Sequence, residues 1–246
     1  MISEMFAHGF IQRAFIGGVL VSLCAALLGV SLVLKRYSMI GDGLSHVSFG
    51  ALSIAIAFGF APIKFSIPIV IIAAFFLLRL AENGKMKSDA AIAMVSASSL
   101  AIGVIVTSLT TGLSTDVCSY MFGSILAMSK DDVIFSVVLS VVVLIMFGFC
   151  YHRIFAVTFD ESFSKATGVK VGMYNTLISI FTAVTVVLGI KMMGAMLISS
   201  LIIFPALTSM RVFKSFLSVT ICSAVIAMIN FIAGLLASYV LSIPAG

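Results

Sequence analysis

The stretch MIGDGLSHVSFG, residues 39–50, opens an apolar segment and places a carboxylate and an imidazole inside it. Asp42 and His46 are four residues apart, so in a helix both side chains project from one face, about one turn apart. A charged group near hydrocarbon costs roughly 2.5–3.5 kcal/mol on insertion scales, and it usually lines a polar path or has a partner. The pair therefore predicts a cation-binding face. The alternative is that Asp42 caps the helix and His46 is a satisfied interior histidine.

The composition around this stretch is that of an integral membrane protein. The 246 residues are 62% hydrophobic and 9% charged, and the mean hydropathy is +1.29, which lies outside the range of soluble domains. A helical span needs about 20 residues, so the chain accommodates about eight spans in a single transmembrane domain, residues 1–246. The expected spans are 10–34, 39–60, 65–80, 90–109, 133–151, 173–190, a seventh that begins near Met192, and 216–241. The serine-rich span 90–109 is expected to pack inside the bundle.

The basic residues lie between the apolar runs and indicate topology. With eight spans, ten of the fourteen basic residues share the side of the Lys35–Arg36 loop. This bias predicts that both termini are outside the cell and that the segment 159–171 is inside. The sequence has no Walker or H-E-x-x-H motif and no C-x-x-C pair, so we expect neither an enzyme nor a structural zinc site. The formal charge of +5 is explained by topology and predicts no nucleic-acid partner.

Four stretches together resemble the permease subunit of zinc and manganese ABC importers, and they span most of the chain. GDGLSH at 41–46 resembles the family signature Gly-Asp-x-x-Ser-His. SYMFGSIL at 119–126 is similar to a Ser-Tyr-x-Phe-Gly-Ser-Ile-Leu run, and DESFSKATG at 160–168 to an Asp-Glu-x-Phe-Ala-x-x-x-Gly segment. GAMLISSLIIFPA at 194–206 resembles Gly-x-Leu-Leu-x-Ser-x-Leu-x-x-x-Pro-Ala. The resemblance implies an all-α fold like that of type II ABC importers.

The second stretch is too short to span a bilayer. We expect a half-length helix covered by the bundle, because irregular backbone at membrane depth must be covered by protein or line a cavity. The alternative is an interfacial hairpin without a role.

The third stretch predicts a short helix, because Asp160 and Glu161 favour its start and Gly168 its end. The resemblance implies that this coupling helix docks into a groove on a cytosolic ATPase, with Phe163 and Ala166 as contact residues. Ser164 stands where the family often has alanine. A solvated connector is the alternative.

The fourth stretch contains Ser199 and Pro205. Proline removes a backbone hydrogen bond and is expected to kink the helix, which exposes carbonyl groups to neighbours or to a path. Both residues are candidates for the path, and the alternative is that they are structural only.

Neutral imidazole together with carboxylate suits zinc, manganese or iron. One Asp42 and one His46 are too few ligands for a filled site, and the resemblance implies that two copies of the chain pair about a central path and supply four. The ion is then a transported substrate, held moderately and released, and no permanent cofactor is expected. Because protonation of His46 competes with metal, uptake is expected to fall below about pH 6.

The sequence thus predicts a permease in the bacterial cytoplasmic membrane for ATP-driven import of zinc or manganese. The expected partners are a second copy, a cytoplasmic ATP-binding subunit, an extracytoplasmic metal-binding protein and the lipid bilayer. The alternatives are a permease for a metal chelate or vitamin, a stand-alone cation channel or carrier, and a membrane scaffold without transport.

Overall fold

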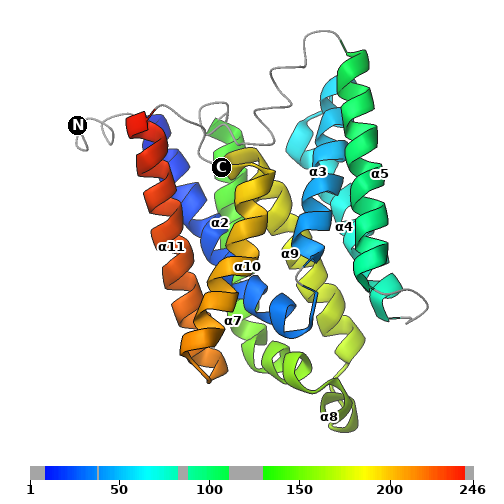
Figure 1. The fold of residues 1–246 in the computed structure, drawn as a ribbon, viewed down its shortest axis with the longest axis vertical. Helices are drawn as coiled ribbons and strands as arrows, with labels where there is room; N and C mark the ends of the chain where they lie inside the picture. The colour runs from blue at the N-terminus through cyan, green and yellow to red at the C-terminus, as the bar shows by residue number, and fades with distance from the viewer. Residues whose placement is uncertain (1–8, 38, 83–87, 111–129, 242–246) are drawn as a thin grey trace.

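The computed structural model describes residues 9–37, 39–82, 88–110 and 130–241. Regular structure in these residues is entirely α-helical. Figure 1 shows the long helices side by side, with the short helix α8 at one end of the bundle, called here the α8 end. The helices are α2 (Gly9–Leu34), α3 (Ile40–Ala57), α4 (Pro62–Glu82), α5 (Ser88–Leu109), α7 (Lys130–Phe159), α8 (Glu161–Ala166), α9 (Val171–Met193), α10 (Ala195–Val212) and α11 (Phe216–Leu241).

The helices have the length and composition of membrane spans. Seven of the described helices, α2, α3, α5, α7, α9, α10 and α11, are long and apolar enough to cross a membrane, and α4 contributes a shorter apolar part, Pro62–Leu77. In hydrocarbon a backbone must satisfy its own hydrogen bonds, and a helix does so internally. The chain is therefore a multi-pass membrane protein, and the expected all-α class is confirmed.

Helix α9 is the centre of the bundle. It contacts α2, α3, α4, α7 and α10. A helix that is apolar around its whole circumference is typical of such a buried position, and α9 has nearly fully buried residues on several faces, among them Ala183, Val186, Leu188 and Met192. Helices α5 and α11 pack on the outside of this group, and the outer helices expose apolar side chains, as a lipid-facing surface requires.

Glycines set the closest helix approaches. A Cβ atom built on Gly29 of α2 would lie 1.9 Å from the carbonyl oxygen of Ile202 in α10, and one on Gly50 of α3 would lie 2.8 Å from the carbonyl oxygen of Ser99 in α5. Real Cβ atoms do not approach other atoms this closely. Small residues therefore allow these backbones to meet.

The helices differ from three expectations. The seventh span, expected to begin near Met192, begins as α10 at Ala195, because α9 continues to Met193 and Gly194 (φ 86°) ends it. Helix α7 continues to Phe159, two more turns beyond Tyr151, the expected end of the fifth span. The serine-rich α5 is not inside the bundle of one chain: it packs on α3 at the edge, and Ser98 is exposed. The predicted half-length helix at 119–126 lies outside the described residues.

Candidate functional site

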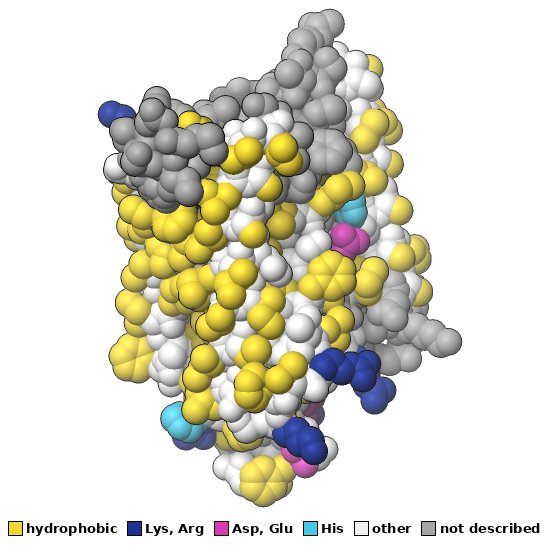
Figure 2. Space-filling view, turned by 60° about the vertical axis from the view of Figure 1, so that its left-hand side comes forward, with side chains coloured by type: hydrophobic (Ala, Val, Ile, Leu, Met, Phe, Trp, Pro, Cys, Tyr) yellow, Lys and Arg dark blue, Asp and Glu magenta, His cyan; other side chains and the backbone are white. Residues whose placement is uncertain are grey.

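Asp42 and His46 lie on one face of α3, as their spacing predicts. His46 Nε2 is 3.7 Å from Asp42 Oδ2, and the two side chains are 25% and 42% exposed, respectively. This separation is longer than a hydrogen bond, so both groups keep lone pairs for a third atom. Figure 2 shows one acidic side chain beside a histidine on a largely apolar part of the surface, whereas Lys and Arg side chains gather toward the α8 end.

The helix start explains why the carboxylate is tolerated there. Met39 is the N-cap of α3 and has no side-chain cap hydrogen bond, so Asp42 is the third helical residue and not the cap that the alternative required. Its charge lies in the first turn, where the helix dipole favours an anion. Figure 1 shows α3 beginning part-way along the bundle, which places this first turn away from the α8 end.

The pair opens into a small cavity between three helices. The cavity has a volume of about 130 Å³. One wall is α3 and the others are α5 and α10, and the lining residues are Asp42, Ser45, His46, Phe49, Leu100, Ala195 and Met196. Since one water occupies about 30 Å³ in the liquid, the space suits a metal ion with a few waters.

Ser199 lies directly against this site. Its Oγ is 3.4 Å from Ser45 Oγ and donates to the carbonyl of Ala195 at 2.9 Å. The Ser45 hydroxyl in turn donates to the carbonyl of Asp42 at 2.7 Å. The structure thus joins Ser199 of α10 to the α3 turn that carries both candidate ligands. Ser199 therefore supports the helical turn that carries Asp42 and His46 and is not itself placed as a ligand.

Pro205 lies farther along α10 and does not line the cavity. It is buried inside the helix, which runs from Ala195 to Val212 on both sides of it. Because proline has no N–H, the carbonyl of Leu201 lacks its usual helical donor. The neighbouring residue Ile202 is where α2 approaches α10 most closely through Gly29. Pro205 therefore lies near the contact between α2 and α10 and not in the cavity. The kink that it is expected to cause in α10 stays a prediction.

The described part of the chain brings two candidate metal ligands together at this cavity, Asp42 and His46. In the described ranges, 9–37, 39–82, 88–110 and 130–241, no three His, Cys, Asp or Glu side chains gather to hold an ion. Transition metals in proteins usually take four or more ligands. The face is open, because Met196 on the cavity rim is 53% exposed. Further ligands must therefore come from water, from the substrate's carrier or from another chain.

The segment after α7 forms the expected short helix, α8, and both ends are capped. The Asp160 carboxylate accepts a hydrogen bond from the backbone N–H of Phe163 at 2.8 Å. At the other end Gly168 has φ 82°, and its N–H donates to the carbonyl of Lys165. Such caps are each worth about 1 kcal/mol and define where a short helix begins and ends.

The exposed face of α8 carries the two predicted contact residues. Phe163 is 63% exposed and Ala166 is exposed. Ser164 is fully buried against the bundle, so the residue that departs from the family pattern points inward. The outward face is therefore an apolar knob that is available to a partner.

The inward side of α8 is held by a buried lysine that the sequence analysis treated only as a topology signal. Lys35 Nζ donates to Glu161 Oε1 at 2.7 Å and to Asn175 Oδ1 at 2.5 Å, and Asn175 Nδ2 donates to the same Glu161 oxygen at 3.1 Å. Burial raises the pKa of Glu161, but the bonds from Lys35 and Asn175 outweigh it and lower that pKa below 4.5. The available signal was Asn175, a strongly polar residue inside a predicted span.

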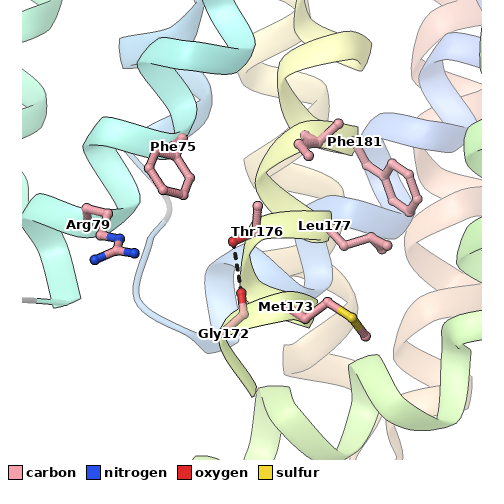
Figure 3. Close-up of a pocket in the computed structure, with 8 residues that line it drawn as sticks. Phe75, Arg79, Gly172, Met173, Thr176, Leu177 and Phe181 are labelled. Atoms are coloured by element: carbon pink, nitrogen blue, oxygen red, sulfur yellow. Dashed lines mark hydrogen bonds between the residues drawn. The ribbon is translucent and has the colours of Figure 1, made fainter. Parts of the chain in front are cut away.

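Two larger cavities lie elsewhere and do not have the same chemistry. One of about 480 Å³ lies between α4 and α9 near the α8 end. Figure 3 shows its walls, with Phe75 and Arg79 on α4 and Thr176 on α9, whose hydroxyl donates to the carbonyl of Gly172. The described residues that line it include no carboxylate, imidazole or thiol. The other, of about 490 Å³, lies beside Lys64, Asp131 and Asp132, and Asp132 pairs with Lys191 at 2.6 Å.

Comparisons with known proteins identify the sequences and the folds that this chain resembles. Residues 7–246 match the family described as the ABC 3 transport family. The chain is 30% identical over 232 residues to the high-affinity zinc uptake system membrane protein ZnuB of Buchnera aphidicola, covering 94% of this chain and 88% of that protein. It is 27% identical over 237 residues to the manganese import system permease protein ScaB of Streptococcus gordonii, covering 96% and 85%. The solved structure of PsaBC from Streptococcus pneumoniae in complex with Fab superposes with a TM-score of 0.87 at 27% identity, covering 100% of this chain and 90% of that one.

Proposed function

The chain belongs to the ABC 3 transport family, and we propose that it imports zinc or manganese through a path whose ligands include Asp42 and His46. It is the membrane permease of an ATP-driven importer of a divalent transition metal, as the family and its zinc and manganese relatives indicate. The chain acts as one transmembrane permease domain and is not itself catalytic. ATP hydrolysis belongs to a separate cytoplasmic subunit.

The observation that carries the proposal is the pairing of carboxylate and imidazole across one small, open cavity. Their 3.7 Å separation leaves lone pairs of both groups free to bind one ion. The mixed oxygen and nitrogen donors suit zinc or manganese better than calcium or magnesium, which prefer oxygen alone. A cavity of about 130 Å³ is well below the roughly 300–1,000 Å³ that small organic molecules require. A bare ion is therefore favoured over a chelate or vitamin.

A second copy of the chain completes the site. The exposed side of α5 carries small side chains, among them Ser98 and Ala101. Small side chains such as these allow a second helix to approach closely. Two chains related by a twofold axis would bring two aspartates and two histidines to one ion. The ion remains a transported substrate, since conduction requires release as well as binding.

The α8 end is the cytoplasmic end. Basic side chains concentrate near this end, in the last turns of helices and in the connections, as positive-inside topology requires. They include Arg153, Lys165, Lys170, Arg211 and Lys214. The apolar knob formed by Phe163 and Ala166 then faces the cytoplasm, where it docks on the ATP-binding subunit. The opposite end receives metal from an extracytoplasmic binding protein. This placement puts the chain in the bacterial cytoplasmic membrane with both termini outside.

Uptake by the assembled importer in proteoliposomes tests the function. The parent should accumulate zinc or manganese only when ATP is present, and Asp42→Ala and His46→Ala should abolish this uptake while the complex still assembles. The matched controls are Asp131→Ala and His152→Ala, which make the same changes at exposed positions. ATP-independent uptake would indicate a channel or carrier. Unchanged uptake in both site variants would contradict the metal-binding role of the pair.

A further inference from the structure

The buried Lys35 lies where the end of α2, the helix α8 and the start of α9 meet. Its side chain is 6% exposed, although it follows directly after α2. Its ammonium bonds Glu161 in the first turn of α8 and Asn175 in the first turns of α9. Asn175 is 3% exposed and also bonds Glu161. The three side chains form a closed triangle, so none can move without breaking a bond to another.

This triangle is stronger than a surface ion pair. Hydrogen bonds between an ammonium and a carboxylate are about twice as strong as neutral ones. A surface pair loses most of its value to solvent screening, but here the ammonium is shielded from water. The Glu161 side chain is 41% exposed and its charge is partly screened, but its removal would leave the shielded Lys35 ammonium without a carboxylate partner, which is costly. The triangle therefore makes a stiff link between α8 and the end of α2.

The link continues from Lys35 to the metal-binding helix through a short, hydrogen-bonded turn. Arg36 adopts a left-handed conformation (φ 61°) and its N–H donates to the carbonyl of Val33. The N–H of Tyr37 donates to Leu32 at 2.8 Å, and the carbonyl of Tyr37 accepts from the N–H of Ile40 at 3.0 Å. Tyr37 is thus bonded to the last turn of α2 and to the first residue of α3.

Asp42 follows two residues after Ile40, so the distance along the chain from Lys35 to a candidate ligand is seven residues.

The two faces of α8 make different contacts. Its outer face presents Phe163 to a partner, and its inner face holds Lys35 through Glu161.

We propose that Lys35 is a positioning residue that transmits movements of the coupling helix α8 to the first turn of α3, and thereby couples ATP hydrolysis to metal binding by Asp42 and His46. This inference rests on the proposed function, because it needs an ATPase docked on α8 and a metal on the pair. When the ATPase displaces α8, Glu161 pulls the Lys35 ammonium, and the turn at Arg36 and Tyr37 shifts the start of α3.

The test compares two variants of the assembled importer in proteoliposomes, with Zn²⁺ and Mn²⁺ as the probes. Lys35→Met removes the ammonium but leaves the Glu161 charge partly buried, which can impair folding. The double variant Lys35→Met/Glu161→Gln removes both charges and keeps the side-chain volumes, and such neutral replacements of buried pairs commonly fold well. Lys170→Met is the matched control, because this lysine is exposed at the same end of the molecule.

We expect the double variant to assemble and to hydrolyse ATP at the parent's basal rate. Its metal uptake per ATP, and its stimulation by metal-loaded binding protein, should fall about fivefold or more, the lower range of typical coupling between sites. Lys170→Met should behave like the parent. A merely structural role for Lys35 would give normal uptake per ATP once the double variant folds.

The possible outcomes separate the two proposals. Parent-like uptake per ATP in the double variant overturns the coupling role of Lys35 and leaves the proposed function intact. A parent complex that takes up neither Zn²⁺ nor Mn²⁺ overturns the proposed function, and the coupling role with it. Loss of ATPase binding in the double variant also contradicts the inference, since the outer face of α8 is unchanged.

Discussion

Replacing Gly29 by alanine should push α2 and α10 apart and disturb the helix that supports the proposed metal site. The added Cβ would lie 1.9 Å from the carbonyl oxygen of Ile202 and 2.9 Å from its carbonyl carbon. Against the 3.0 Å that real Cβ atoms respect, the shortfall is about 1.1 Å, and a backbone atom in a packed helix interior cannot yield as a flexible side chain does. The two helices must therefore separate or tilt.

The expected cost follows from overpacking. Insertion of one methyl group into a well-packed interior typically costs about 1–3 kcal/mol. Gly148→Ala in α7 makes the same chemical change where nothing lies within 4 Å of the new atom, and its effect should be neutral or stabilising by up to about 1 kcal/mol. The two variants should therefore differ by roughly 1–4 kcal/mol in the free energy of unfolding.

Denaturation of both variants in detergent micelles measures this difference, and uptake assays show whether the site is affected as well. Gly29→Ala should also reduce uptake, because α10 carries Ser199 against the turn between Asp42 and His46. A Gly29→Ala variant as stable as Gly148→Ala would show that α2 and α10 do not meet at Ile202, and would refute the packing argument.

Three further outcomes are expected at the α8 end. Arg36→Gly should raise stability by about 0.5–1 kcal/mol, because glycine adopts the left-handed conformation without a Cβ clash, and a lower melting temperature would contradict this. Asp160→Ala should weaken binding of the ATP-binding subunit, because loss of the cap to Phe163 costs about 1 kcal/mol of helix stability; an unchanged dissociation constant would contradict it. Glu161→Gln should be less stable than the parent at neutral pH. The pKa of Glu161 in the folded protein lies below 4.5. The difference in stability between the parent and Glu161→Gln should therefore be complete above pH 4.5 and should vanish as the pH falls through the pKa of the folded state. A stability difference that grows on acidification would exclude the pairing of Glu161 with Lys35.

The membrane class and most of the helices could be predicted from sequence, because the uninterrupted apolar runs leave few alternatives in a bilayer. The helix ends were harder to predict from the sequence. Hydropathy is equally high on both sides of Gly194, and only its left-handed conformation separates α9 from α10. Likewise, His152 and Arg153 suggest an interface, yet α7 continues to Phe159 because a helix does not end where the membrane does.

Composition could not predict whether a span lies inside the bundle or at its edge. Ser98 suggested an interior helix, but in one chain α5 lies at the edge of the bundle. Hydropathy and small residues report compatibility with close packing, and they do not say whether the neighbour belongs to the same chain. The exposed Ser98 and the incompletely surrounded Asp42 and His46 agree with a neighbouring helix from a second copy of the chain.

The site itself was predictable only where its residues are local. Asp42 and His46 are one helical turn apart, so spacing alone places them together. Lys35 and Glu161 are separated by 126 positions, and their contact depends on how α2, α8 and α9 pack. For the same reason the contact of Ser199 with Ser45 was not predictable from sequence.

The central claim is that Asp42 and His46 of two copies bind one transported ion. Equilibrium binding of Zn²⁺ and Mn²⁺ to the purified permease assembled with its ATP-binding subunit tests it most directly, with Asp42→Ala, His46→Ala and the controls Asp131→Ala and His152→Ala measured alongside. We expect one ion for every two copies of the chain, lost in both site variants and retained in both controls. Binding of one ion to each copy, or binding that survives both site substitutions, would contradict the shared site.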